Sequence, residues 1–258
     1  MKTIDEYLQS IEDNSKTIEI MPTGFSKLDS FLSGGFMKKE LVILGGFTGS
    51  GKSYVAGQIG WNVARKGFKV GYFSLEISGE MVVSRLVGSM CNIHPTLIVM
   101  NKLEPEQIEK ADDAKMDVAT FGELIEIHDD VYELNAIIKT IAENKYDFVI
   151  IDFIQNVISR GEEYERMSSV SLSLQKVAKI HNCCVLALSQ LSNTAHKTGA
   201  VEYKGSGGIA MVADLGFFLL RDDTTGGVKL ALRKNRRGFS GQDFELKFQK
   251  PGGKINEE

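Results

Sequence analysis

The sequence predicts an α/β fold, in which a mainly parallel, twisted sheet is flanked by helices and ends in a β-rich segment. From about residue 40, short apolar runs alternate with longer stretches of helical periodicity. This alternation is typical of parallel sheets that carry helices on both faces. After residue 212 only strand-like runs remain, which predicts the β-rich end. A chain of 258 residues can bury the core of one domain of this kind.

A short amphipathic helix is expected at the N-terminus, over residues 3–15. Thr3 followed by Glu6 has the form of a capping box, which sets the start of the helix. One face carries an apolar stripe made of Ile4, Tyr7, Leu8 and Ile11. This helix either folds back on its own domain or docks on a neighbouring subunit, and the sequence leaves both open. We therefore divide the chain into a linker-type helix (1–20) and a main domain (21–258).

Within the main domain, apolar runs predict buried strands and the stretches between them predict helices. The strands are Leu41–Leu44, Val70–Leu75, Leu124–Ile127, Phe148–Ile151 and Val185–Leu188, followed by Phe217–Leu220, Val228–Leu232 and Phe244–Phe248. The helices cover about residues 52–66, 78–91, 104–119, 131–144 and 164–182. Pro105 takes a first-turn position, and Asp130 with Glu133 predicts a capping box. Gly226-Gly227 predicts a hairpin turn.

The composition excludes several classes of protein. With 43% hydrophobic and 25% charged residues, it is that of a soluble globular protein. No apolar run approaches the ~20 residues that span a bilayer. Residues 1–10 carry charges where a signal peptide needs an apolar stretch. We therefore expect a cytoplasmic protein without membrane contact.

The cysteines and the net charge narrow the expected chemistry further. Cys91, Cys183 and Cys184 lack the paired spacing of a metal or redox site, which favours buried, reduced thiols. The net charge of −4 offers no general attraction to nucleic acid. Any binding to DNA would therefore need a local basic surface.

The most specific motif is a glycine-rich loop between the first apolar run and the helix after it. Residues 46–53 read Gly-Phe-Thr-Gly-Ser-Gly-Lys-Ser, a complete G-x-x-x-x-G-K-S pattern. Glycines let successive backbone N–H groups curl round phosphates, and the helix N-terminus adds its positive end. The expected cradle consists of Gly46, Thr48, Gly49, Ser50 and Gly51. Lys52 would reach the β- and γ-phosphates of ATP, and Ser53 would hold Mg²⁺.

An acid at the end of another strand would complete the metal site. Asp152 directly follows Phe148–Ile151, which places a carboxylate at a strand tip. No second acid follows it, so the carboxylate that orients or deprotonates the attacking water must come from elsewhere. Glu76, which follows Val70–Leu75, is the best candidate, and an ordinary surface glutamate is the alternative.

Two further features lie nearer the C-terminus. Gln190 ends a predicted strand and could hydrogen-bond the γ-phosphate, or simply open a loop. Residues 233–238 read Arg-Lys-Asn-Arg-Arg-Gly, which is usually a solvated turn. In an ATPase that assembles in a ring, such a run can enter the neighbouring site. An arginine there accelerates phosphoryl transfer by ~10³–10⁵.

These segments, taken in order, resemble the motifs of the DnaB-type replicative DNA helicases, whose motor domain is a RecA-like P-loop NTPase. The resemblance covers about residues 20–250. Besides the phosphate loop, it rests on Thr23–Asp29 with Gly34-Gly35, Phe73–Ser78, Ile151–Gln155, Ala187–Leu191, and Lys234–Gly238 with Gly241. It implies that Glu76 is the catalytic glutamate, Asp152 the metal-binding acid and Gln190 the γ-phosphate sensor. Lys234 and Arg236 match the family's trans-acting cations.

The resemblance also implies a hexameric ring with ATP at subunit interfaces and single-stranded DNA in its channel. The ring would move 5′ to 3′ along this DNA. Two loops, at about 156–168 and 193–209, would hold the DNA. In the second loop, lysines and backbone amides could contact phosphates without reading bases, although a plain surface loop is equally compatible. The residues concerned are Lys197, Lys204, Gly205 and Gly207. The N-terminal helix would pack on the adjacent subunit.

The sequence departs from the family in three respects. The N-terminal helical domain that contacts primase has no counterpart, which makes a primase contact doubtful. Small and apolar residues at 204–212 replace a polar run, so the grip on DNA could differ. A helicase loader is a possible partner, although any C-terminal tail for it is absent or cut away. The prediction is a helicase motor. The alternatives are a DnaB-like ATPase that assists assembly or loading without unwinding, and a recombinase or KaiC-like ATPase.

Overall fold

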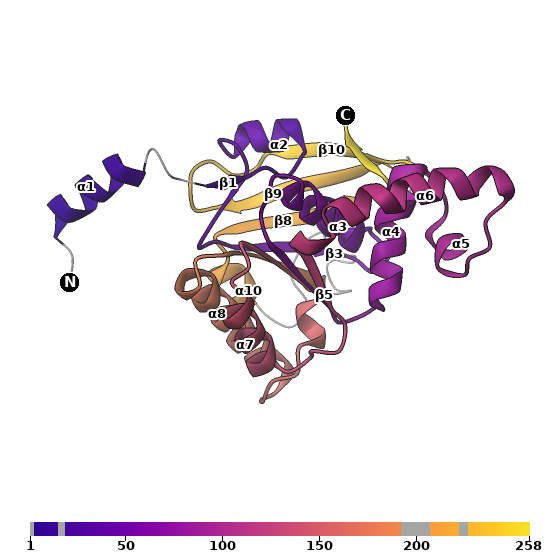
Figure 1. Ribbon diagram of the computed structural model, residues 1–258. Coiled ribbons are helices and arrows are strands. Elements are labelled where there is room, and N and C mark those ends of the chain that lie inside the picture. Colours follow the sequence, from indigo (N-terminus) through magenta and orange to yellow (C-terminus); the bar gives the residue numbers. More distant parts are fainter. Residues whose placement is uncertain (1–2, 15–18, 192–206, 222–226) are drawn as a thin grey trace.

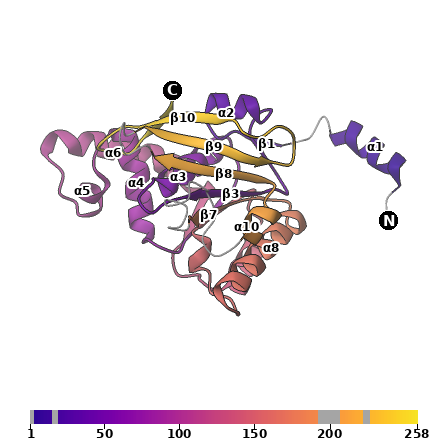
Figure 2. The ribbon, with the colours of Figure 1, turned by 180° about the vertical axis from the view of Figure 1, so that it is seen from behind.

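The centre of the fold is a sheet built from the apolar runs of the sequence (Figure 1). The computed structural model describes residues 3–14, 19–191, 207–221 and 227–258. Within these residues the strand order is β11-β10-β9-β8-β3-β7-β6-β4-β5. The parallel part comprises β3 (Leu41–Gly46), β4 (Val70–Ser74), β5 (Ile125–His128), β6 (Phe148–Asp152), β7 (Cys184–Gln190) and β8 (Leu215–Arg221). The antiparallel end comprises β9 (Val228–Asn235), β10 (Asp243–Phe248) and β11 (Ile255–Glu257), seen beside β8 in Figure 2.

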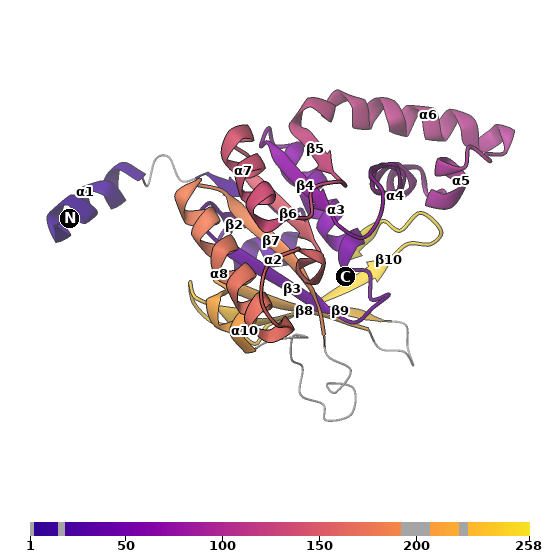
Figure 3. The same cartoon turned by 90° about the horizontal axis from the view of Figure 1, so that it is seen from below.

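Helices cover both faces of this sheet, as Figure 3 shows from below. One side carries α2 (Ser26–Phe31), α3 (Lys52–Ala64) and α4 (Gly79–Cys91), with α5 (Pro95–Val99) and α6 (Pro105–Thr120) following α4. The other side carries α7 (Leu134–Asn144), α8 (Glu163–Ile180) and α10 (Gly207–Val212). The short helices η1 (Gly122–Leu124) and η2 (Ile154–Asn156) follow α6 and β6, and β1 (Ile20–Met21) pairs with β2 (Phe36–Met37).

The alternation of side chains along each strand explains the two-sided core. In β3, Val42 and Leu44 pack with the helices α2 and α3, whereas Leu41 and Ile43 pack with α7 and α8. Because both faces are covered, every residue of β3 is buried. This arrangement confirms the predicted α/β class, the mainly parallel sheet and the β-rich end.

The predicted strands and helices of the main domain are confirmed with boundaries that shift by a few residues, and one capping prediction is wrong. Asp130 and Glu133 do not form a capping box: α7 begins only at Leu134, and no side chain caps it. The reason is a backbone bridge, because Ile158 N donates to Tyr132 O and Leu134 N donates to Ile158 O. The predicted hairpin joins β8 and β9 antiparallel, although Gly226 itself lies outside the described residues.

The N-terminal helix α1 (Ile4–Asn14) forms as predicted, but it does not fold back on its own domain. Its capping box is present, with Thr3 N donating to Glu6 Oε2 (2.6 Å) and Glu6 N to Thr3 Oγ1 (3.3 Å). Figure 1 shows α1 apart from the sheet and its helices. The apolar stripe is open to solvent, with Ile4 79% and Ile11 64% exposed. An apolar stripe of this kind is typical of a helix face that packs against another surface.

Candidate nucleotide-binding site

The phosphate loop connects the end of β3 at Gly46 to the start of α3 at Lys52. Two of its glycines adopt left-handed backbone, Gly49 at φ +75° and Gly51 at φ +98°. A Cβ on Gly51 would also lie 2.7 Å from the ring of Phe248. Glycine is therefore required at Gly51 by both conformation and space. The loop opens directly onto the N-terminus of α3, where backbone N–H groups favour anions.

The lysine of the loop is folded onto the loop backbone. Lys52 Nζ donates to Gly46 O (2.8 Å) and Phe47 O (2.9 Å), and the side chain is buried. Burial lowers the pKa of Lys52, while the negative charges of Asp152 and Glu76 act to raise it. An ammonium group held this way is poised to exchange the two carbonyls for phosphate oxygens.

Asp152 lies at the end of β6 and is only 2% exposed. Its Oδ2 accepts a hydrogen bond from Tyr72 Oη at 2.8 Å. Burial raises the pKa of Asp152, and hydrogen bonds from Tyr72 and Ser53, with the charges of Arg85 and Lys52, act to lower it. The link to Ser53 joins the two residues that were predicted to bind the metal.

Most of the residues predicted to bind or hydrolyse the nucleotide within one subunit come together in one pocket of about 210 Å³. Those that line it are Thr48, Gly49, Gly51, Lys52, Ser53, Glu76, Asp152 and Gln190. The parallel register brings them together, because β3, β4, β6 and β7 all end at this edge of the sheet. Gly46 forms the last pair of β3 with Gln190, and Ser50 is buried within the loop.

Glu76 stands at the exposed side of this pocket, two residues after β4. Hydrogen bonds fix the chain immediately before it: Leu75 N donates to Asp152 O and Asn156 Nδ2 donates to Leu75 O, both at 2.8 Å. At the end of β7, Gln190 N donates to Gln155 Oε1 (3.3 Å). The tips of β4, β6 and β7 are thus tied to one another.

Two polar residues of this site were missed by the sequence reasoning. Arg85 lines the pocket from α4, with its guanidinium 4.8 Å from the centre of the Tyr54 ring. Arg85 is the only cation in α4, but a single cation in a helix does not indicate which pocket it enters. Tyr72, the partner of Asp152, sits in an apolar strand and gave no motif signal. Tyr54, Ile77 and Phe153 also line the pocket and were not predicted.

The residues present suit a magnesium nucleotide. Ser53 and Asp152 supply the hard oxygen ligands that Mg²⁺ prefers. Among the described residues, no group of three or more His, Cys, Asp or Glu is placed to hold a metal ion alone. The hydroxyl of Ser50 is a buried polar atom without a hydrogen-bond partner, inside the cradle.

Lys234 and Arg236 lie away from this pocket. In the sheet Lys234 pairs with Gly216, and the adjacent Leu215 pairs with Val42 at the start of β3, whereas the phosphate loop follows the end of β3. Lys234 Nζ and Arg236 Nη2 both donate to Met211 O, at 2.7 and 2.9 Å. Arg236 Nη1 also pairs with Asp214 Oδ1 at 2.9 Å.

The other two cations of the basic run have separate partners. Arg233 Nη1 donates to Asp243 Oδ1 at 2.6 Å. Arg237 is held against the body of the domain: its guanidinium forms an ion pair with Glu40 and donates hydrogen bonds to Leu32 O and Gly35 O. Of the four cations in this run, Lys234 and Arg236 therefore share the surface at the C-terminal end of α10.

The predicted DNA-binding residues fall mostly outside the described part of the chain. Lys197, Lys204 and Gly205 are in the segment 192–206, and Gly207 is the first residue of α10. The other predicted loop, 156–168, is described and includes the start of α8 at Glu163. The side chain of Met211 on α10 is 74% exposed, and it belongs to the small and apolar residues that stand where the family has a polar run.

The sequence of this chain is similar to those of known replicative helicases. The replicative DNA helicase DnaB of Geobacillus stearothermophilus is 30% identical over 229 residues, which cover 84% of this chain and 50% of that protein. The DnaB helicase of Treponema pallidum (strain Nichols) is 26% identical over 247 residues, covering 92% of this chain and 56% of that protein. The chain thus spans about half the length of these relatives.

Solved structures show the same fold. One of them, described as an ATPase domain, superimposes with a TM-score of 0.87 at 23% identity, covering 99% of both chains. A DnaB-like replicative helicase, solved in a study of its interactions with primase, gives 0.84 at 23% identity over 99% of this chain and 67% of that one. A KaiC-like protein of Pyrococcus horikoshii OT3 gives 0.66 at 17% identity, covering 93% and 99%.

No helix of the described residues is both long and apolar enough to cross a membrane. The sequence profile of the family described as "DnaB-like helicase C terminal domain" matches residues 21–257, which leaves only the segment with α1 and the last residue outside it. The main domain of this chain therefore belongs to the DnaB-like helicase C-terminal domain family.

Proposed function

We propose that this domain is an ATP-dependent DNA helicase motor, which hydrolyses ATP at the subunit interfaces of a hexameric ring and moves 5′ to 3′ on single-stranded DNA during replication. One observation carries the proposal. Lys52, Ser53, Glu76, Asp152 and Gln190 line a single pocket at the edge where the parallel strands end. That set can bind a nucleotide triphosphate with Mg²⁺ and place a carboxylate beside it.

The chemistry follows from the position of each residue. Lys52 transfers its hydrogen bonds from the loop carbonyls to the β- and γ-phosphates, and Gln190 contacts the γ-phosphate from the end of β7. Ser53 and Asp152 would hold Mg²⁺, which neutralises charge on the phosphates when bound. Glu76 orients the attacking water and accepts its proton, since it is the second carboxylate that lines the pocket.

The ring assignment is supported by the position of the two cations. Lys234 and Arg236 lie at the opposite edge of the sheet from their own phosphate loop. In a ring with head-to-tail contacts, that edge can face the nucleotide of the next subunit. There Arg236 would stabilise charge on the transferring phosphoryl group. The exposed stripe of α1 supplies a second contact to the adjacent subunit.

Unwinding of a forked DNA with a 5′ single-stranded tail tests this function. The proposal predicts strand separation that requires ATP and is abolished by Lys52→Ala, with a fork bearing only a 3′ tail left intact. Slow hydrolysis without unwinding, together with capture of a replication protein, would favour the assembly or loading subunit instead. Filaments that pair homologous strands would favour the recombinase or KaiC-like alternative.

A further inference from the structure

Tyr72 connects the interior of the sheet to the candidate metal site. It lies in β4, which pairs with β6 so that Tyr72 faces Ile150 and Ser74 faces Asp152. The phenol is 4% exposed, and its hydroxyl donates to Asp152 Oδ2 at 2.8 Å. The hydroxyl is the donor of this hydrogen bond and the carboxylate of Asp152 is the acceptor.

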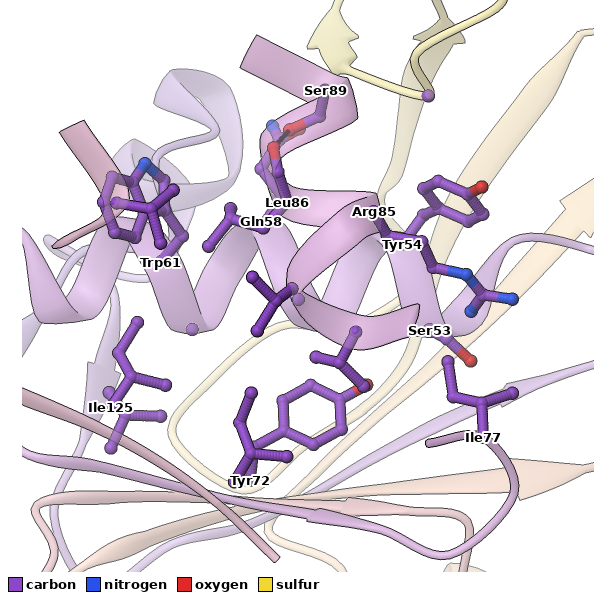
Figure 4. Close-up of a pocket in the computed structure, with 18 of the residues that line it drawn as sticks. Ser53, Tyr54, Gln58, Trp61, Tyr72, Ile77, Arg85, Leu86, Ser89 and Ile125 are labelled. Atoms are coloured by element: carbon purple, nitrogen blue, oxygen red, sulfur yellow. Dashed lines mark hydrogen bonds between the residues drawn. The ribbon is translucent and has the colours of Figure 1, made fainter. Parts of the chain in front are cut away.

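The surroundings of the Tyr72 side chain suggest that its hydrogen bond to Asp152 fixes the orientation of the phenol ring. One side of Tyr72 borders a cavity of about 260 Å³ between α3, α4 and the strands β4 and β5. Figure 4 shows the ring beneath the two helices, with its hydroxyl on the side of Ser53 and Ile77. Close packing, which holds most buried aromatic rings, is therefore absent on this side. The bond to Asp152 supplies the orientation that packing leaves open.

The same bond constrains Asp152 in return. A carboxylate has two oxygens with about four sites for hydrogen bonds or metal ions. With a phenol on Oδ2 from the interior, the remaining sites turn toward Ser53 and the nucleotide pocket. Partners of this kind, one step removed from a metal, orient its ligands and typically change metal affinity by ~10–100-fold when lost.

We propose that Tyr72 is a positioning residue of the magnesium site: its hydroxyl holds Asp152 in the orientation that binds the metal of the nucleotide complex. This inference rests on the proposed function, because it concerns how the nucleotide's metal is bound. It extends the site to a residue that contacts neither nucleotide nor metal. It predicts a defect in the use of Mg²⁺ rather than in folding or in binding of the nucleotide itself.

The test is binding of fluorescent ADP to the full chain, at increasing Mg²⁺ and in excess EDTA, for Tyr72→Phe and a matched control. Tyr146→Phe removes the same atom from another buried tyrosine, whose hydroxyl bonds Glu126 and His128 away from the pocket. We expect Tyr72→Phe to raise the Mg²⁺ concentration at half-saturation about tenfold. Affinity in EDTA should stay within about twofold of wild type, because Lys52 is held by the carbonyls of Gly46 and Phe47 and the Tyr72 hydroxyl by Asp152.

The outcomes separate this inference from the proposed function. Suppose that the wild type binds ADP more tightly with Mg²⁺, but that Tyr72→Phe leaves the Mg²⁺ concentration at half-saturation unchanged. This result overturns the role of Tyr72 and leaves the magnesium site standing. Equal losses with Mg²⁺ and in EDTA overturn it as well, since they mark general damage to the fold. If the wild type gains nothing from Mg²⁺, the magnesium site itself fails, and this inference fails with it.

Discussion

Replacement of Arg236 tests whether the active site is completed across subunits, because its own phosphate loop is out of reach. Asp214, which pairs with Arg236, also accepts a hydrogen bond from Leu41 N at the start of β3. The phosphate loop follows the other end of this strand, Leu41–Gly46, which lies about 17 Å away at ~3.3 Å per residue. An arginine side chain does not span that distance, so Arg236→Ala should remove a contact to the neighbour's nucleotide.

The expected magnitudes separate catalysis from stability. Loss of an arginine finger costs ~10³–10⁵ in turnover. The Arg236–Asp214 pair is 2.9 Å long, but the arginine side chain is 45% exposed. Asp214 is only 15% exposed, and Arg236 also donates to Met211 O, so the free energy of unfolding should fall by about 1–3 kcal/mol. Arg233→Ala is the matched control: it lies in β9, three residues before Arg236, is 40% exposed and bonds Asp243, and it should leave turnover unchanged.

The assay mixes inactive subunits and follows phosphate release. Rings assembled from equal amounts of Arg236→Ala and Lys52→Ala subunits contain interfaces that pair an intact Lys52 with an intact Arg236. At random assembly about one quarter of the interfaces are of this kind in a head-to-tail ring. Turnover should therefore recover to roughly that fraction of wild type. No recovery in rings shown to be mixed would refute the trans role, as would a loss of ATP binding in Arg236→Ala.

Three other substitutions test the loop, α4 and α1. Gly51→Ala should weaken ATP binding and lower the free energy of unfolding by at least ~1–2 kcal/mol, because Gly51 has a positive φ and a Cβ there would meet the ring of Phe248. Gly57→Ala in α3 is the control, since a Cβ there meets no other atom. It should be neutral or slightly stabilising in the same thermal and binding titrations. Arg85→Ala should weaken binding of ATP by about tenfold or more, as for a lost hydrogen bond to a charged group, and an unchanged Kd by calorimetry would remove Arg85 from the site. Ile11→Ser in α1 should reduce ring assembly in sedimentation without changing the Tm, since the side chain is already 64% exposed; unchanged assembly would argue against docking of α1 on a neighbour.

The parts of the site that local strings encode could be predicted from the sequence. Lys52 and Ser53 are set by the loop motif, and Asp152 and Glu76 by their positions at strand ends. Because parallel strands end at one edge of a sheet, strand order along the chain was enough to place these residues together. The register of the sheet brings them into the same pocket.

The remaining features depend on contacts between distant segments. Tyr72 meets Asp152 only because β4 pairs with β6 in one register, across 80 residues of sequence. Arg85 reaches the pocket because α4 packs beside α3, and no periodic pattern in α4 announces that contact. The capping box predicted at Asp130 failed for a similar reason, since a backbone bridge to Ile158 delays the start of α7. Short elements such as α2 and β11 have too few residues to show a period.

The most direct test of the helicase function is the steady-state ATPase rate with and without single-stranded DNA, with Lys52→Ala as the blank. A motor that couples the pocket to DNA should hydrolyse ATP faster when single-stranded DNA is added, and the stimulation should vanish in the blank. ATP binding with a slow rate that DNA does not change, measured on assembled rings, would contradict the helicase function and favour an assembly or loading role.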